Sequence, residues 1–398
     1  MKSNTIDTVV GIDISKDKFD VCCLTKDSRE LFRVSEPMDI NGFDRLAHTI
    51  MSHIADPASV VIGMESTGCY HLNLFSYLTH RNYLTLIINP LLVKNFMKVD
   101  LRKTKTDRKD AAGIARFLLE HQDVVHQLNS SEEIGDLRDL ARQRESLNRQ
   151  ISAMKNDLKR LLSITFPELE KRTNVFSRSV LELLTRYPSA RAIRSASADE
   201  IDKSLREGAS GRKPYVTAQQ CKEAAQVSIG TSRKGKEFVV AQKASMLLYM
   251  EGKLNEVSET LIEMCEVLLQ KDMEIMTSIR GIGQTTASEF LGEMGGDIDK
   301  FKNVKKIIAF AGLDPSVHES GKYKGQSKIS GRGAHFLRAV IWQMTVKVIR
   351  YNELFQEYFQ RRRKEGLPYK KAVLATAHKL IRVIFSMLKH KTLFAHPL

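Results

Sequence analysis

The stretch TVVGIDISKDKFDVCCLT (residues 8–25) contains two short β-rich runs joined by the polar link KDK. Apolar, β-branched runs separated by a few polar residues favour antiparallel pairing, so TVVGIDIS and FDVCCLT predict a β-hairpin. LFRV (31–34) supplies a third strand. The N-terminal part of the chain is therefore expected to open a sheet with three consecutive strands.

Helices and strands alternate after this hairpin. We expect a helix around 41–54, a buried strand at 58–65, a helix at 71–81 and a buried strand at 83–89. Three early strands followed by helix–strand alternation indicate an α/β domain with a mixed sheet over residues 1–125.

Two heptad patterns flank the middle of the chain. The first has apolar residues at alternating spacings of four and three: Leu147, Ile151, Met154, Leu158 and Leu161. The second runs from Leu247 to Leu268. A 3.5-residue period drives helix pairing, which predicts an antiparallel coiled coil within 126–275 and a loop-rich helical insert at 166–240. Ordinary core helices of a bundle are the alternative.

Composition indicates a globular protein of two or three domains. The 398 residues are 42% hydrophobic and 27% charged, which is ordinary for such proteins. The five cysteines show no CxxC spacing, which favours reduced thiols. Neither an apolar run of about 18 residues nor a signal-peptide layout occurs. We therefore expect a cytoplasmic protein that does not enter a membrane.

Positive charge is concentrated in the last quarter of the chain. The net charge is +15, and from Lys302 onward 20 Lys and Arg face 5 Asp and Glu, so this segment alone carries the whole excess. Such asymmetry is typical of a nucleic-acid-binding segment; a solvated tail is the alternative. We expect a helical C-terminal domain at 276–398 with helices near 302–312, 333–350, 352–364 and 368–390.

Two glycine-containing segments of this domain are candidates for phosphate contact. SIRGIGQTTASEFLGEMG (278–295) carries a helix-hairpin-helix signature, in which Gly281 and Gly283 let backbone N–H groups face a phosphate. VHESGKYKGQSKISGRG (317–333) is either a surface loop or a segment that approaches an anion, with Ser320, Ser327 or Ser330 acting on it. Its cations could offset phosphate charge: Lys322, Lys324, Lys328 and Arg332.

Four acidic residues form the candidate catalytic set. Asp13 and Glu65 each close an apolar strand, where α/β folds place their chemistry. Asp107 and Asp110, in KTDRKDA, share one face of a helix. Together they could hold two Mg²⁺ ions roughly 4 Å apart, which would activate a hydroxyl against a phosphodiester. The alternatives are a turn at Asp13, a helix-cap partner at Glu65 and ion pairs within KTDRKDA.

The motifs together resemble a known family. VVGIDISKDKFDV, MESTGCY, INP followed by KTDRKDA, GIGQTTA, FAGLDPSVHESGKYKGQ and ISGRGAHFLRAVI occur in this order. The sequence resembles the DEDD insertion-sequence transposases, the bridge-RNA-guided recombinases related to the Piv DNA invertases, over about 1–125 and 275–390. KTDRKDA and GLDPSVHESGKYKGQ are the specific blocks.

The resemblance implies a RuvC-like N-terminal domain whose acidic set is Asp13, Glu65, Asp107 and Asp110. It also implies that Ser320, in the E-S-G motif, is a nucleophile that forms a covalent phosphoserine link to DNA. The implied partners are double-stranded donor and target DNA, a structured guide RNA and further copies of the chain, as a dimer or tetramer on the nucleoid. Lys103 and Lys105 would contact nucleic acid.

Other interpretations stay open at this point. One is a RuvC-class structure-specific endonuclease whose C-terminal part only binds DNA, and another is a non-enzymatic nucleic-acid-binding scaffold. His318 could serve as a base, and Tyr323 could be a rival nucleophile. A sugar-kinase-like ATPase is disfavoured because no second phosphate loop follows VVGIDISKDK.

Overall fold

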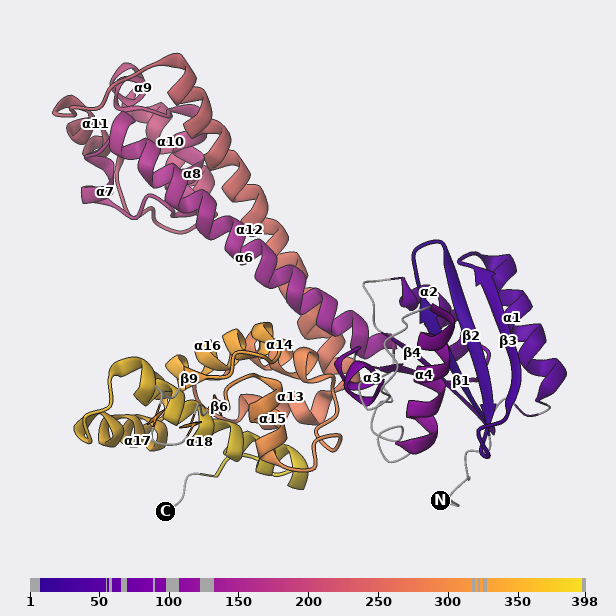
Figure 1. Ribbon diagram of the computed structural model, residues 1–398. Coiled ribbons are helices and arrows are strands. Elements are labelled where there is room, and N and C mark those ends of the chain that lie inside the picture. Colours follow the sequence, from indigo (N-terminus) through magenta and orange to yellow (C-terminus); the bar gives the residue numbers. More distant parts are fainter. Residues whose placement is uncertain are drawn as a thin grey trace. The chain divides into compact units, whose positions relative to one another are not determined.

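The computed structural model in Figure 1 describes residues 8–54, 56, 59–65, 70–88, 90–97, 107–121, 132–316, 319–320, 323–324 and 328–395. For a few of these, Asp107 and Ser320 among them, only the backbone is described. The chain forms two compact units, Met1–Gly135 and Asp136–Leu398. The first is built on a sheet, whereas the described part of the second is mainly helical.

The sheet of the first unit has the strand order β3-β2-β1-β4-β5. Its strands are β1 (Thr8–Ile14), β2 (Lys18–Thr25), β3 (Glu30–Pro37), β4 (Val60–Glu65) and β5 (Leu84–Ile88). β2 pairs antiparallel with β1 and β3, while β4 pairs parallel with β1 and β5. The predicted hairpin, third strand and mixed sheet are confirmed, in the order of a ribonuclease-H-like fold.

Helices cover both faces of this sheet (Figure 1). α1 (Ile40–His53) and α2 (His71–Thr79) bury one face, toward which Val10 and Ile12 point. α4 (Asp107–Glu120) covers the other face, toward which Val9 points, and α3 (Pro90–Met97) packs beside α4. Because β1 is buried on both faces, its sequence is an almost unbroken apolar run rather than an alternating one.

The approach of α4 to the sheet is unusually close. A Cβ added at Gly11 would lie 2.3 Å from the Ala111 carbonyl oxygen and 2.4 Å from the Ala115 nitrogen. At Gly63 an added Cβ would lie 2.7 Å from Leu118 Cδ1. The helix backbone can rest on β1 only because glycine leaves that space empty. This packing fixes the first turn of α4 beside the end of β1.

The second unit contains two long helices, α6 (Glu132–Thr165) and α12 (Lys234–Leu268), which lie side by side in Figure 1. Lys155 Nζ lies 2.7 Å from Glu251 Oε1, and Lys243 Nζ lies 3.0 Å from Asp157 Oδ2. Residue numbers on α12 fall as those on α6 rise, so the pair is antiparallel. The coiled coil itself and the boundaries at 125 and 275 stay predictions.

Short helices pack around one end of this pair. They are α7 (Leu169–Arg172), α8 (Arg178–Arg186), α9 (Ala190–Ser195), α10 (Ala198–Ala209) and α11 (Ala218–Gln226). Leu183 and Leu184 share a core with Phe166 and Leu247. A capping box of Ser197 with Glu200 begins α10, which satisfies backbone donors that the first turn leaves unpaired. The segment between the long helices therefore has a core of its own.

The C-terminal part of this unit is helical. Its helices are α13 (Gln270–Thr277), α14 (Gln284–Met294), α15 (Val304–Phe310), α16 (His335–Tyr351), α17 (Glu353–Lys364) and α18 (Tyr369–His390). No helix in the described part of the chain is long and apolar enough to cross a membrane. The four described cysteines are buried and unpaired with one another: Cys22, Cys23, Cys221 and Cys265.

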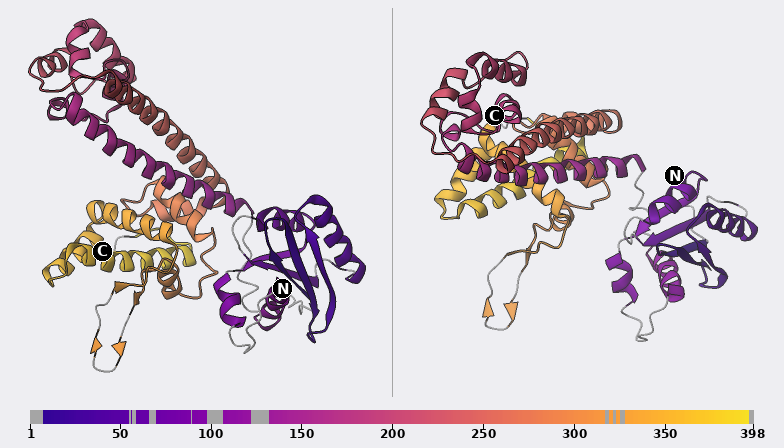
Figure 2. Two further views of the ribbon diagram at one scale, coloured as in Figure 1. Left: turned by 45° about the horizontal axis from the view of Figure 1, so that its top comes forward. Right: turned by 90° about the horizontal axis from the view of Figure 1, so that it is seen from above.

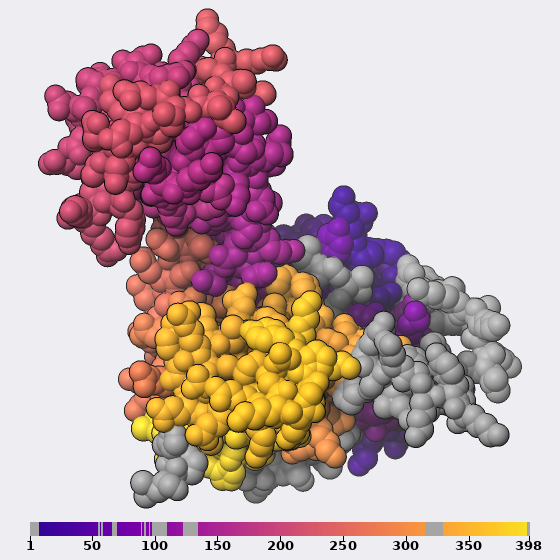
Figure 3. Space-filling model, turned by 90° about the vertical axis from the view of Figure 1, so that its left-hand side faces the viewer, coloured from indigo at the N-terminus to yellow at the C-terminus, as the bar shows by residue number. Residues whose placement is uncertain are grey.

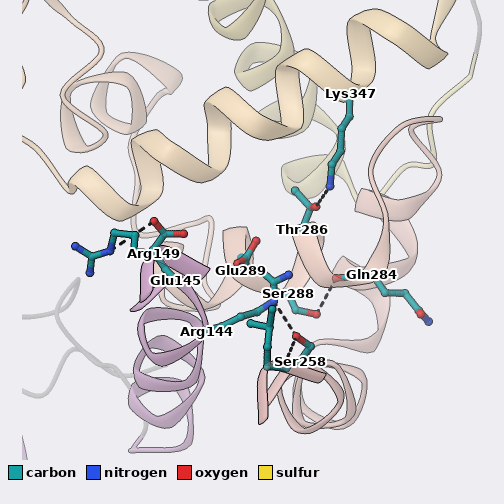
Figure 4. Close-up of polar contacts among 10 residues, drawn as sticks. Arg144, Glu145, Arg149, Ser258, Gln284, Thr286, Ser288, Glu289 and Lys347 are labelled. Carbon is teal, nitrogen blue, oxygen red and sulfur yellow. Dashed lines mark hydrogen bonds and ion pairs between the residues drawn. The ribbon is translucent and has the colours of Figure 1, made fainter. Parts of the chain in front are cut away.

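Two ion pairs with buried carboxylates join α6 to α14. Arg142 Nε lies 2.9 Å from Glu293 Oε1, and Arg144 bonds to Glu289. Figure 4 shows Arg144 between Glu289 and Ser258, whose Oγ accepts a 2.8 Å hydrogen bond from Arg144 Nε. Burial raises the pKa of the Glu289 carboxyl, and the guanidinium of Arg144 counteracts this. The pair thus partly offsets the cost of burying a carboxylate between the two helices.

We expect Arg144→Ala to destabilise the helical unit by about 3–5 kcal/mol, because Glu289 would be left as an uncompensated buried charge. The midpoint of urea unfolding, followed by far-UV circular dichroism, measures the effect. Arg149→Ala is the matched control: its ion pair with Glu145 spans 3.9 Å on an exposed face, and its loss should cost under about 1 kcal/mol. Equal effects of the two changes would contradict the prediction.

Candidate active site

Two of the predicted carboxylates lie on the sheet face that α4 covers. Side chains alternate along a strand, and Val9 and Gly11 of β1 face this helix. Asp13 is therefore on the same side. On β4, Val61 belongs to the same core, which places Glu65 on this side as well.

The parallel register brings these two positions to neighbouring strand ends. Ile12 of β1 is the partner of Met64 of β4, so Asp13 and Glu65 are each the next residue along. Adjacent strands lie roughly 4.8 Å apart. Both side chains are partly exposed. The sequence prediction that strand-closing carboxylates share one edge agrees with this arrangement.

Asp107 and Asp110 belong to the first turn of α4. Asp107 is the first residue of the helix, and its side chain lies outside the described part. Asp110 is partly exposed and directly precedes Ala111, whose carbonyl rests against Gly11. The start of α4 therefore lies over Gly11, which precedes Asp13 by two residues in β1.

The donor chemistry of this group fits a hard divalent cation. Carboxylate oxygens are the ligands that Mg²⁺ prefers, and Asp13, Glu65 and Asp110 come from elements that meet on one face. Among the described side chains, no three His, Cys, Asp or Glu are grouped tightly enough to hold a metal ion. The side chain of Asp107 lies outside the described part of the chain. Metal binding by this set therefore stays a prediction.

Asp20 is a further carboxylate beside this group, which the sequence analysis did not select. It is the cross-strand partner of Asp13 and is only 5% exposed. Lys18 Nζ donates a 2.8 Å hydrogen bond to Asp20 Oδ2. Cross-strand partners project to the same face, so Asp20 shares the α4 side of the sheet. Alternation along Lys18, Asp20 and Cys22 is the signal that could have revealed it.

Ser320 lies on a narrow two-stranded hairpin. β6 (Pro315–Ser316) pairs with β9 (Lys328–Ile329), and farther out β7 (Glu319–Ser320) pairs with β8 (Tyr323–Lys324). Ser320 is the ladder partner of Tyr323, so only two residues separate it from the returning strand. In both views of Figure 2 the orange β7 and β8 arrows lie away from the helices. Ser320 thus lies on the outer of two short strand pairs.

The base of this hairpin is firmly braced. Ser330 Oγ donates to Asp314 Oδ1 at 2.5 Å, and Ser330 N donates to the Asp314 carbonyl at 2.8 Å. Gly312 has a φ of +65°, and a Cβ added at Gly333 would lie 2.2 Å from the Phe310 carbonyl oxygen. Ser330 therefore has a structural contact at the base, which distinguishes it from Ser320. Ser327 lies outside the described residues.

The predicted phosphate-contacting cations of this segment are only partly described. Arg332 is exposed beside the hairpin base. Lys324 and Lys328 lie on β8 and β9, where only the backbone is described. Lys103, Lys105, Lys322 and His318 lie outside the described residues. Their contacts with nucleic acid stay predictions.

The turn between α13 and α14 uses its two glycines differently. Gly281 has a φ of +105°, and an added Cβ would lie 2.9 Å from Val348 Cα of α16. Gly283 precedes α14 as its N-cap, with nothing within 4 Å of an added Cβ. Lys347 Nζ donates to Thr286 Oγ1 at 3.2 Å (Figure 4). Packing against α16 thus explains Gly281, whereas Gly283 borders open space.

A ribonuclease-H-like sheet with acidic strand ends, followed by a basic helical unit, defines a class of DNA-processing enzymes. Two family models match the chain: a DEDD transposase model over residues 10–167 and the transposase IS116/IS110/IS902 family over 273–360. The chain belongs to this family of insertion-sequence transposases, whose members cleave and rejoin DNA.

Several relatives are similar over most of their length. A 42 kDa protein of insertion element IS900 from Mycobacterium paratuberculosis is 28% identical over 74% of this chain and 73% of its own. The pilin gene-inverting protein of Moraxella lacunata is 23% identical over 97% of both chains. A 44.8 kDa protein of insertion element IS116 from Streptomyces clavuligerus is 26% identical over 73% of this chain and 72% of its own.

We expect Gly11→Ala to destabilise the first unit by about 3 kcal/mol, since the new methyl group would overlap the α4 backbone. It should also displace Asp110 from Asp13 and abolish DNA cleavage. Gly252→Ala is the control, because an added Cβ there meets nothing within 4 Å and mid-helix alanine is favoured over glycine. Thermal unfolding and cleavage assays test both; a stable, active Gly11→Ala protein would contradict the packing argument.

Proposed function

We propose that the protein is a site-specific recombinase in which Ser320 is the nucleophile and the acidic set near β1 and β4 assists it. The observation that carries the proposal is the hairpin, which places Ser320 near the end of a projecting ladder and leaves Ser330 to brace its base. Such a ladder can reach a phosphodiester that the helical core could not approach. Similarity to a pilin gene-inverting protein over 97% of both chains supports a reaction that rejoins the strands it cuts.

The chemical step transfers a phosphoryl group. The Ser320 Oγ forms a bond to phosphorus while the bond from phosphorus to one deoxyribose oxygen breaks. The serine proton leaves to a base, and the released deoxyribose oxygen takes up a proton. A hydroxyl of the partner strand then displaces the serine, so the number of phosphodiester bonds is conserved without ATP. A serine hydroxyl is a poor nucleophile at neutral pH, so this step requires activation.

The acidic set supplies the other half of the proposal. Asp13, Glu65, Asp107 and Asp110 would hold one or two Mg²⁺ ions, which would lower the pKa of a bound hydroxyl and neutralise charge on the phosphate. The packing of Ala111 against Gly11 supports a position for Asp110 near the end of β1. They come from the first unit and the serine from the second, within one chain or between copies.

The remaining features complete this picture. We infer that donor and target DNA are chosen by a structured RNA from the element and that the active form is a homo-oligomer. The paired heptads of α6 and α12 support a coiled-coil role in assembly. The open side of Gly283, at the start of α14, supports a helix-hairpin-helix contact with a phosphate. The division into 1–125, 126–275 and 276–398 then separates metal binding, assembly and strand transfer, and the protein acts in the cytoplasm on nucleoid DNA.

Ser320→Ala should abolish the covalent protein–DNA adduct while leaving DNA affinity unchanged, because it removes only the attacking oxygen. Denaturing gel electrophoresis of protein bound to labelled DNA measures the adduct. Ser327→Ala, a serine change in the same segment, is the control and should retain it. An adduct at the unmodified level with Ser320→Ala would rule out this nucleophile.

Asp13→Asn should abolish both adduct formation and recombination, since a neutral amide cannot replace a carboxylate ligand of Mg²⁺. Comparison of Asp13→Asn with Ser320→Ala distinguishes a recombinase from an endonuclease. If Asp13→Asn stops cleavage but Ser320→Ala still releases free DNA ends, the protein is a RuvC-class endonuclease and the serine mechanism fails. Loss of cleavage in both variants supports the recombinase.

A further inference from the structure

The last helix of the chain has an unusual charge distribution. After Glu365 no Asp or Glu occurs, while six Lys and Arg do. The buried side of α18 is apolar or neutral, with Ala372, Val373, Leu380 and Ile384 among its residues. Its cations are therefore on the remaining surface. Figure 3 shows that the yellow C-terminal helices form much of the face of the helical unit turned to the viewer.

Four basic side chains of α18 lie along a single line. Lys371, His378, Arg382 and Lys389 are spaced by 7, 4 and 7 residues. At roughly 100° per residue these positions fall within about 40° of one another around the helix axis. They extend over about 27 Å, at 1.5 Å per residue. That length matches about eight base pairs of a DNA duplex, at roughly 3.4 Å each.

Acidic neighbours neutralise the C-terminal end of this region but not the rest of it. Lys389 Nζ lies 3.7 Å from Asp299, and Lys391 Nζ lies 2.6 Å from Asp272. Lys371 and Arg382 are exposed, and Lys379 is partly exposed. Among the described residues none of these three has an acidic partner within 4.0 Å. We call these three residues the cationic face of α18.

α17 adds charge beside this face. The Tyr358 ring has Lys379 Nζ 4.7 Å from its centroid, Arg361 Cζ at 5.2 Å and Arg362 Cζ at 5.0 Å. Three cations thus gather around one aromatic ring, with Glu365 as the ion-pair partner of Arg362. Concentrated positive charge of this kind attracts a polyanion and repels other cations.

The line of basic residues passes the root of the serine hairpin. His378 Nε2 donates to the Leu313 carbonyl at 3.1 Å, and Leu313 directly precedes Asp314, which bonds to Ser330. Burial lowers the pKa of His378; the hydrogen bond to Leu313 opposes this change, and Arg382 lowers the pKa further. The net lowering suits a neutral imidazole that ties α18 to the hairpin base. Lys371 and Arg382 therefore lie on either side of the point where α18 contacts the hairpin base.

We propose that the cationic face of α18 binds the phosphate backbone of the DNA duplex that Ser320 cuts. This inference rests on the proposed function for its orientation, because the same helix contacts the base of the Ser320 hairpin. Binding is independent of sequence, since lysine and arginine on an exposed helix face recognise phosphate charge rather than base edges. Duplex DNA is favoured over RNA because the serine attacks DNA.

The double variant Lys371→Gln/Arg382→Gln tests the proposal. Each phosphate contact contributes about 0.9 to the slope of log affinity against log salt concentration, so the slope should fall by about 1.8. Affinity for a 24-base-pair duplex should then fall about 60-fold in 0.1 M salt. Fluorescence anisotropy over a series of salt concentrations measures both quantities, with circular dichroism to verify folding.

Lys203→Gln/Arg194→Gln is the matched control, because both residues are exposed on other helices and the charge change is the same. An unchanged slope in the α18 variant, or an equal loss in the control, would overturn the proposal. Weaker binding of a structured RNA hairpin with unchanged DNA binding would assign the face to RNA and overturn it too. All measurements are made in the Ser320→Ala background, so failure of the serine mechanism does not affect them.

Discussion

The close contact of α4 with β1 is the constraint on which the first unit depends. At Gly11 the helix backbone occupies the space that any side chain would fill. That contact sets the height of α4 above the sheet and therefore the position of Asp110 relative to Asp13. Catalytic groups tolerate errors of only about 0.5 Å, and a backbone-to-backbone contact varies less than one made through long side chains. Gly11 is thus a condition for the close packing that brings α4 to β1.

The helical unit is organised by a different interaction. Arg144 and Glu289 are both largely withdrawn from water, and such pairs often add little net stability because desolvation offsets their attraction. Their effect is on specificity, since a shift of α6 along α14 would leave two charges buried without partners. Glu293 with Arg142 repeats the constraint one turn away. Together they fix where the long helix leaves the C-terminal helices.

Much of this fold could be predicted from patterns in the sequence. Alternation and β-branched residues located the strands, and the acids at strand ends located the edge where Asp13 and Glu65 meet. Long-range packing could not be read in the same way. Nothing in the local sequence distinguishes Gly11, which leaves room for a helix, from a glycine in a turn. Likewise, the local sequence does not distinguish Glu289 from a surface glutamate, because its partner Arg144 comes from α6. Asp20 was missed because its role depends on the register of β2 against β1.

The Ser320 hairpin is braced at its base. Ser330, Asp314 and the contact of Gly333 with Phe310 fix the base, and Arg338 donates to the Ala311 carbonyl at 3.0 Å nearby. An isolated two-stranded hairpin is only marginally stable in water, which makes these contacts at the base important. Under the proposed function, this serine would be positioned for attack when DNA and a carboxylate site surround it. Such a requirement would couple strand cleavage to assembly.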